Sequence, residues 1–163
     1  MQGSNSKITT WKAQNAILFP EIIKMLNEGH TATLPLRGFS MRPFLEDGRD
    51  SALLKKIGDV RIGDPVLAEI KPGKWVLHRL IAINGDDVTL LGDGNLTPEY
   101  CKKADLRAEV VGFYRKKRTT LDTVRGRKWR LYSWFWMHLR PIRITRRITL
   151  ALYRRWIKLF GTI

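Results

Sequence analysis

The sequence is poor in the residues that build covalent or metal-linked scaffolds. Its 163 residues contain one cysteine, Cys101, and three histidines. A single cysteine forms no internal disulfide, and a cysteine-based structural zinc site needs several such ligands. The Walker loop, the Rossmann fingerprint and the His-Glu-x-x-His zinc motif are also missing. The sequence therefore implies no metal and no cofactor.

Long apolar runs are equally scarce. In the C-terminal part the longest run without a charged residue, Leu131 to Leu139, has nine residues, whereas a helix needs about 20 to span a bilayer. The N-terminal residues lack the apolar segment after a basic start that marks an export signal. We therefore expect an intracellular chain with neither a transmembrane helix nor a cleaved leader.

Acidic residues are nearly absent from one part of the chain. Residues 1–115 carry 16 basic and 14 acidic side chains, whereas residues 116–163 carry 14 basic and one acidic, so the tail holds most of the formal net charge of +15. Four of the six tryptophans also lie in the tail. We expect an N-terminal helical segment (1–30), a nearly neutral β-rich domain (31–115) and a basic amphipathic helical tail (116–163).

The apolar pattern changes along the chain. Between Trp11 and Leu26 apolar residues recur at spacings of three and four, which predicts a helix. Short apolar runs bounded by turn residues then predict strands at Thr31–Leu36, Ser51–Lys55, Pro65–Ile70, Trp75–Ile83, Val88–Leu91 and Glu109–Tyr114. Asn84-Gly85 between two such runs is a strong hairpin signal. Because no helical crossover separates the runs, we expect a mainly β, antiparallel fold.

Two helices are expected in the tail, at Lys128–Leu139 and Ile142–Phe160. In the second, apolar residues share one face and arginines lie roughly opposite. Such a tail suits an anionic membrane surface, a nucleic acid, or packing on the body with a solvated charged face. We favour peripheral binding of residues 128–160 to an anionic membrane surface at the cytoplasmic face, and regard nucleic acid as the weaker alternative.

Three short motifs carry the residues suited to catalysis. They are Gly38-Phe39-Ser40-Met41-Arg42-Pro43, Trp75-Val76-Leu77-His78-Arg79-Leu80, and Gly92-Asp93-Gly94-Asn95 followed by Pro98-Glu99. A serine hydroxyl is a poor nucleophile until a base removes its proton, and His78 is the only histidine of the β-rich domain. Its ordinary pKa near 6.5 suits general-base work. A carboxylate on the far ring nitrogen would come from Asp93 or Glu99.

In this order the motifs resemble those of type I signal peptidases and the related LexA-like serine peptidases. The resemblance rests on Ser-Met-x-Pro, a Gly-Asp pair before a strand, His-Arg, and Gly-Asp-x-Asn, and it covers about residues 34–113. Where bacterial signal peptidases place a lysine base, this chain has His78. It is therefore similar to the Ser–His branch found in endoplasmic-reticulum, archaeal and some bacterial signal peptidases.

The resemblance implies a β-rich peptidase fold and a serine endopeptidase that removes a leader or signal segment from a precursor. Ser40 would be the nucleophile and His78 the base, with Glu99 and Asp93 orienting His78. It further implies that the substrate pairs as an extended strand beside the site. The oxyanion and substrate-binding positions would be Gly38, Phe39 and Met41, together with the Ser40 backbone N–H. The alternative is a non-catalytic or nucleic-acid-binding module that retains this fold.

Overall fold

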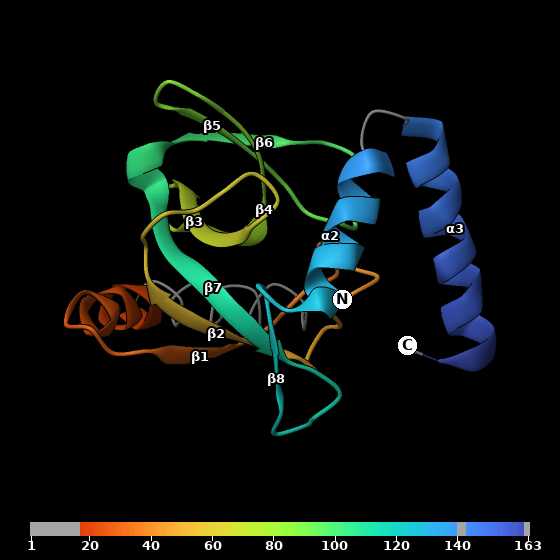
Figure 1. Cartoon of the computed structure of the whole chain (residues 1–163), viewed down its shortest axis with the longest axis horizontal. Coiled ribbons are helices and arrows are strands. Elements are labelled where there is room, and N and C mark those ends of the chain that lie inside the picture. The colour runs from red at the N-terminus through yellow and green to blue at the C-terminus, as the bar shows by residue number, and fades with distance from the viewer. Residues whose placement is uncertain (1–16, 140–142, 162–163) are drawn as a thin grey trace, which may run out of the picture.

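The computed structural model describes residues 17–139 and 143–161. In this part the chain forms an N-terminal helix, an eight-stranded antiparallel sheet and two C-terminal helices (Figure 1). The N-terminal helix includes residues 17–27, and its predicted beginning at Trp11 lies outside the described residues. The predicted arrangement, an antiparallel body between an N-terminal helix and two C-terminal helices, is confirmed. The expectation of a mainly β fold is corrected, because the helices make the content mixed α/β.

The strands follow one another along the chain without a helical crossover, and the longest connection between two of them joins β1 to β2. They are β1 (Ala32–Pro35), β2 (Ser51–Lys56), β3 (Pro65–Lys71), β4 (Lys74–Asn84), β5 (Asp87–Leu91), β6 (Glu99–Lys102), β7 (Leu106–Tyr114) and β8 (Leu121–Thr123). A short 3₁₀ helix, η1 (Lys103–Asp105), precedes β7, and the C-terminal helices are α2 (Arg127–Leu139) and α3 (Arg143–Phe160). The sheet order is β1-β2-β7-β3-β4-β5-β6, and β8 pairs with β7.

Glycine-containing turns set the register of the two central hairpins. The β4–β5 hairpin turns at Asn84-Gly85, with Asn84 opposite Asp87 and Gly85 at φ +60°. The β3–β4 hairpin turns at Gly73, whose φ is +71°. These positive φ angles strain residues that carry a Cβ, so glycine favours both turns. The hairpin predicted at Asn84-Gly85 is confirmed.

Two strands were not predicted. Strand β6 has the sequence Glu-Tyr-Cys-Lys and β8 only Leu-Asp-Thr, so neither shows an apolar run. Their strand conformation depends on long-range pairing, of β6 with β5 and of β8 with β7. Strand β7 also begins at Leu106, three residues before the prediction. Tertiary pairing therefore overrides weak local preference here.

The apolar core has two parts. In one, the N-terminal helix, β1, β2, β7 and α2 enclose buried side chains that include Leu26, Phe113 and Trp129. In the other, β3 to β7 enclose a smaller cluster around Val66, Leu80 and Leu90, with Cys101 packed at its margin. The serine-containing loop after β1 contributes Met41, Phe44 and Leu45 to the first cluster, so the core itself holds that loop in place.

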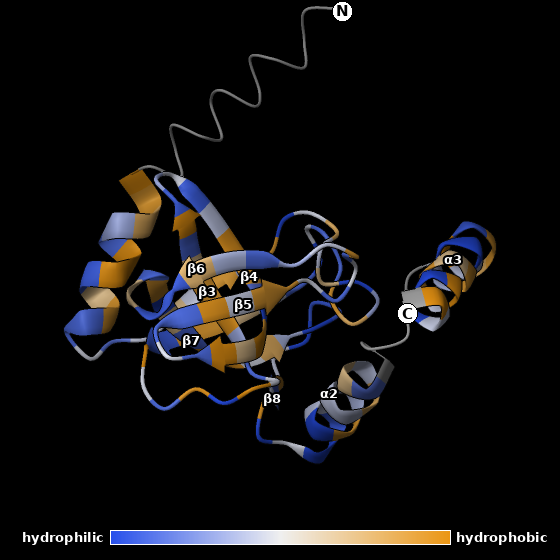
Figure 2. Ribbon diagram, turned by 90° about the horizontal axis from the view of Figure 1, so that it is seen from above, coloured by the Kyte–Doolittle hydropathy of each residue, from blue (hydrophilic) through white to orange (hydrophobic). Residues whose placement is uncertain are grey.

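Helix α2 belongs to the body rather than to a separate tail. Trp129 and Trp136 are only 2% exposed, whereas Trp134 and Trp156 are exposed. Figures 1 and 2 both place α2 and α3 side by side, at the end of the molecule opposite the N-terminal helix. Within the described residues, neither helix has the length and apolarity required to cross a membrane.

Candidate active site

Ser40 lies on a loop, residues 36–50 (the serine loop), that joins β1 to β2. The ends of the loop meet where the Leu36 N–H donates to the Asp50 carbonyl over 2.9 Å. The buried Asp50 carboxylate also accepts hydrogen bonds from the backbone N–H groups of Glu46 and Lys116, at 3.0 and 2.9 Å. These bonds satisfy backbone groups at the two ends of the loop. Ser40 lies away from these ends and is half-buried.

The third motif forms a second loop, residues 92–98 (the acid loop), between β5 and β6. The Gly94 N–H donates to the Ser40 carbonyl over 2.7 Å. A Cβ on Gly92 would stand 2.5 Å from the Ser40 carbonyl oxygen, and one on Gly94 would stand 2.5 Å from that of Phe39. The two glycines of Gly-Asp-Gly-Asn therefore permit the acid loop to pack backbone against backbone on the serine loop.

His78 lies between these loops, on β4, with 4% of its side chain exposed. Its Nδ1 is 2.7 Å from Oε2 of Glu99, the first residue of β6. Among the described residues neither buried atom has another hydrogen-bond partner. The other oxygen of Glu99 accepts a hydrogen bond from Lys74 Nζ at 3.0 Å. Glu99 is thus fixed between a lysine and the histidine ring.

The second ring nitrogen of His78 faces the serine loop. His78 Nε2 and the Ser40 carbonyl oxygen both lie within 3.0 Å of one point, the position that a Cβ on Gly92 would occupy. The acid therefore lies at one ring nitrogen and the serine loop at the other. This is the order that a Ser–His–acid mechanism requires.

Burial sets the protonation state of His78. Removing the ring from water lowers its pKa below the ordinary value of 6.5, and the neighbouring charge of Glu99 offsets part of that effect. The imidazole is consequently neutral at pH 7. A neutral imidazole is the form that accepts a proton.

Ser40 and His78 line the same cleft, which has a volume of about 120 Å³. One wall is the strand segment 75–78 of β4 and the other contains residues 36–38 of the serine loop. Among the described residues the Ser40 hydroxyl makes no hydrogen bond to His78. Catalytic hydrogen bonds of substrate-free enzymes often tighten only when substrate binds.

The oxyanion positions differ from the expectation at Gly38. The Gly38 N–H donates to Asp47 Oδ1 over 2.8 Å, so it does not point into an open hole. By contrast, the Ser40 N–H has no acceptor among the described residues. Phe39 is 57% exposed, with the Arg42 guanidinium 4.1 Å above its ring. Met41 is buried and lines the cleft.

Among the described residues, the Asp93 carboxylate pairs with Arg79 and Tyr132 rather than with His78. Both oxygens of its buried carboxylate accept from Arg79, Oδ1 from Nε at 2.8 Å and Oδ2 from Nη2 at 2.7 Å. The Tyr132 hydroxyl donates to the same carboxylate at 2.8 Å. Of the two carboxylates left open by the sequence, Glu99 is therefore the partner of His78, and Asp93 anchors the acid loop to β4 and α2.

Several residues that support the site were not singled out from the sequence. Arg79 also donates to the Gly63 carbonyl at 2.7 Å and to Ser133 Oγ at 2.6 Å. Its position directly after His78 was the one available signal. Arg146 and Tyr153 of α3 gave none, because Arg146 is one of six basic residues in that helix and Tyr153 is followed directly by two arginines.

Comparison with known proteins adds no relative. No model of a protein family matches the chain, and no curated protein is detectably similar to it. Within the described residues no three His, Cys, Asp or Glu side chains cluster as ligands for a metal ion. The argument for function consequently depends on the geometry of the site itself.

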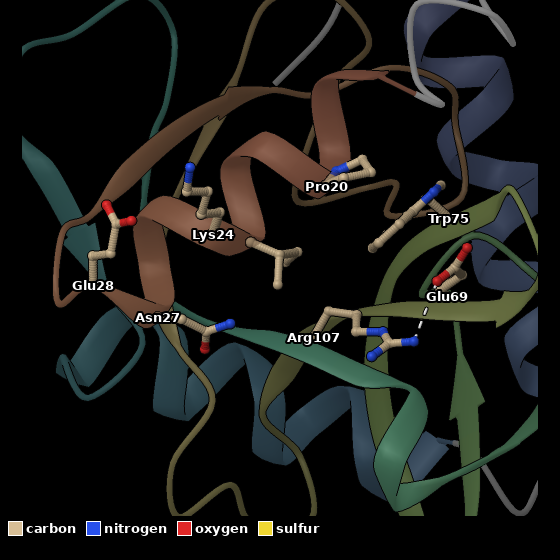
Figure 3. Close-up of a pocket in the computed structure, with 8 residues that line it drawn as sticks. Pro20, Lys24, Asn27, Glu28, Glu69, Trp75 and Arg107 are labelled. Carbon is tan, nitrogen blue, oxygen red and sulfur yellow. Dashed lines mark hydrogen bonds and ion pairs between the residues drawn. The ribbon is translucent and has the colours of Figure 1, made fainter.

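A wider hollow of about 590 Å³ lies beside the cleft (Figure 3). Trp75 lines both, and its ring stacks on Phe19 of the N-terminal helix with centroids 4.5 Å apart. Glu69 and Arg107 pair at 3.3 Å on one side of this hollow. A chain lying in the cleft therefore has a second, partly charged surface within reach.

Proposed function

We propose that the protein is a serine endopeptidase of the signal-peptidase type, which removes a leader or signal segment from a precursor. The observation that carries the proposal is the convergence of Ser40, His78 and Glu99 from three separate elements. The acid lies 2.7 Å from one ring nitrogen of a buried histidine, and the serine loop lies at the other. The ordered motifs that resemble the Ser–His signal peptidases support the same proposal.

In this mechanism the Ser40 hydroxyl attacks the carbonyl carbon of the scissile peptide bond, while His78 Nε2 accepts the hydroxyl proton. The protonated ring then gives that proton to the leaving amine as the C–N bond breaks. Water, deprotonated by the same nitrogen, hydrolyses the acyl-enzyme and frees Ser40. Glu99 stabilises the imidazolium in both halves of the reaction. The Ser40 N–H is the available donor for the oxyanion.

The cleft suits an extended peptide. Strand β4 pairs with β5 only from Arg79 onward. Among the described residues, the segment Lys74–His78 therefore pairs with β3 on one side and with no strand on the other. This open edge is one wall of the cleft. A substrate that adds a strand there would bring its scissile bond to Ser40 and His78. Residues farther from the bond would reach the hollow beside Trp75.

Covalent capture tests the proposal directly. A fluorophosphonate probe should label Ser40 alone, as located by mass spectrometry, and the wild-type protein should cut a leader-bearing precursor at one position. The Ser51→Ala variant is the matched control and should label normally. Absence of labelling and cleavage, together with RNA binding that falls steeply with salt, would favour the non-catalytic nucleic-acid-binding alternative.

The pH profile provides a separate prediction. Because burial lowers the pKa of His78, kcat/KM should be level across pH 7 and fall only below the ordinary value of 6.5. Glu99→Gln removes the charge that favours the imidazolium, so the acid limb should move to still lower pH. The kcat should also fall by roughly 10²–10⁴-fold. Both quantities follow from initial rates measured between pH 4 and 9.

Two variants sharpen this measurement. Glu99→Asp keeps the charge but shortens the side chain, so its acid limb should stay closer to that of the wild type. Glu109→Gln removes a carboxylate that pairs with Lys55 at the surface and should leave the profile unchanged. A profile that rises only above pH 8–9 would contradict the histidine base and indicate a lysine instead.

Peripheral association with a membrane fits this function. Leader segments are often apolar, and α3 exposes apolar and basic side chains together. We therefore include binding at a membrane surface in the proposed function.

A further inference from the structure

The inner face of α3 contacts both loops of the candidate active site. Arg146 Nη2 donates to the carbonyls of Gly92 and Asp93, at 2.7 and 3.0 Å, in the acid loop. The Tyr153 hydroxyl donates to Glu46 Oε1 in the serine loop at 2.7 Å. Both side chains are buried, as is Leu150 between them. One helix thus holds the two loops from the same side.

The outer face of α3 has the opposite character. It carries a row of bulky apolar side chains that are each between 48% and 74% exposed; this α3 stripe consists of Ile144, Ile148, Leu152, Trp156, Leu159 and Phe160. The colouring of Figure 2 shows apolar and polar segments interleaved along the helix. The neighbouring helix α2 also exposes apolar side chains, Leu131, Trp134 and Phe135. A row of exposed apolar side chains such as the α3 stripe marks an interaction site.

The charges beside the stripe decide among the possible partners. Arg147, Arg154, Arg155 and Lys158 are all exposed, and α3 contains no acidic residue. A second copy docked stripe to stripe would bring two basic helices together. A nucleic acid would satisfy the charge but leave six apolar side chains in water. An anionic bilayer satisfies both, because arginines meet headgroup phosphates while the apolar row enters the acyl boundary.

We propose that α3 lies in the plane of an anionic membrane surface, with the α3 stripe inserted and the flanking arginines on the headgroups. Its inner face then holds the serine and acid loops next to that surface, where leader segments of membrane-associated precursors are found. The first part specifies the membrane binding that the proposed function includes, and the second part also rests on the proposed peptidase activity. Lipid binding does not depend on that activity.

Sedimentation with vesicles tests the proposal on the full chain carrying Ser40→Ala, which separates binding from catalysis. Vesicles of phosphatidylcholine and phosphatidylglycerol at 7:3 should bind the protein much more tightly than phosphatidylcholine alone. Replacing Ile148, Leu152 and Trp156 by Ser should weaken binding by about 100-fold or more. Replacing Arg147, Arg154 and Arg155 by Gln should weaken it by roughly 100-fold, and only on the anionic vesicles.

Matched controls lie on the body away from α3, on the sheet and in η1. The triple variant Lys56→Gln/Lys71→Gln/Lys103→Gln removes the same charge from exposed positions away from α3, and Tyr100→Ser removes an exposed aromatic side chain. Both should bind vesicles nearly as the wild type does. Undiminished binding by the stripe variant would overturn the proposal, as would RNA binding without vesicle binding or a dimer that the stripe variant abolishes. Vesicle binding without precursor cleavage would instead contradict only the peptidase function.

Discussion

The variants Ser40→Ala and His78→Ala should each lose about 10⁴-fold or more in kcat/KM for precursor cleavage. Without the Ser40 hydroxyl no acyl-enzyme forms, and without the imidazole nothing removes the hydroxyl proton. Because the two residues act as a unit, the double variant should be no slower than either single variant. The measurement is the initial rate of cleavage of one precursor by all four proteins.

Controls for this experiment come from the same residue types. Ser51 begins β2, and His30 is exposed at the end of the N-terminal helix; neither lines the cleft. Ser51→Ala and His30→Ala should cleave within a few-fold of the wild type. The Ser40→Ala protein should also unfold at the wild-type temperature, since the change removes one half-buried hydroxyl. Losses that simply add in the double variant would contradict a shared catalytic unit.

Much of the sheet was predictable because its signals are local. Asn84-Gly85 identifies a hairpin from two adjacent residues, and the apolar runs of β3 and β5 coincide with observed strands within one residue at each end. Strand β6 escaped prediction because pairing with β5 holds a polar tetrapeptide in place. Its first residue is Glu99, so the position of the acid beside His78 depends on a contact that no local pattern contains.

The support of the site was hidden for the same reason. A strand arginine ordinarily extends into solvent, yet Arg79 is 1% exposed. Its partners come from the acid loop, from Gly63 and from α2. The strong positive charge of the tail likewise suggested one external surface. In the structure, however, a basic side chain of the tail is buried against the body, while others are exposed. Arg146 is buried on the acid loop, whereas Arg147, the next residue, is exposed.

Arg79→Met should lower the free energy of unfolding by about 3–5 kcal/mol. The substitution leaves the Asp93 carboxylate buried without its counter-charge, since that carboxylate is also only 1% exposed. Trp129, whose ring lies 4.8 Å from the Arg79 guanidinium, loses a cation–π contact as well. Denaturant unfolding, followed by circular dichroism, gives the loss directly.

A surface pair provides the comparison that makes this result specific. Arg125 pairs with Asp64 at 3.1 Å but is 57% exposed, so Arg125→Met should cost less than about 1 kcal/mol. Asp93→Asn removes the negative charge that Arg79→Met leaves buried without a counter-charge. The double variant Arg79→Met/Asp93→Asn should therefore lose less free energy of unfolding than the sum of the losses of the two single variants. If Arg79→Met lowered the free energy of unfolding no more than Arg125→Met, the Arg79–Asp93 pair would not be what holds the acid loop. The hydrogen bonds that Arg146 and Trp136 donate to carbonyls of that loop would then have to hold it.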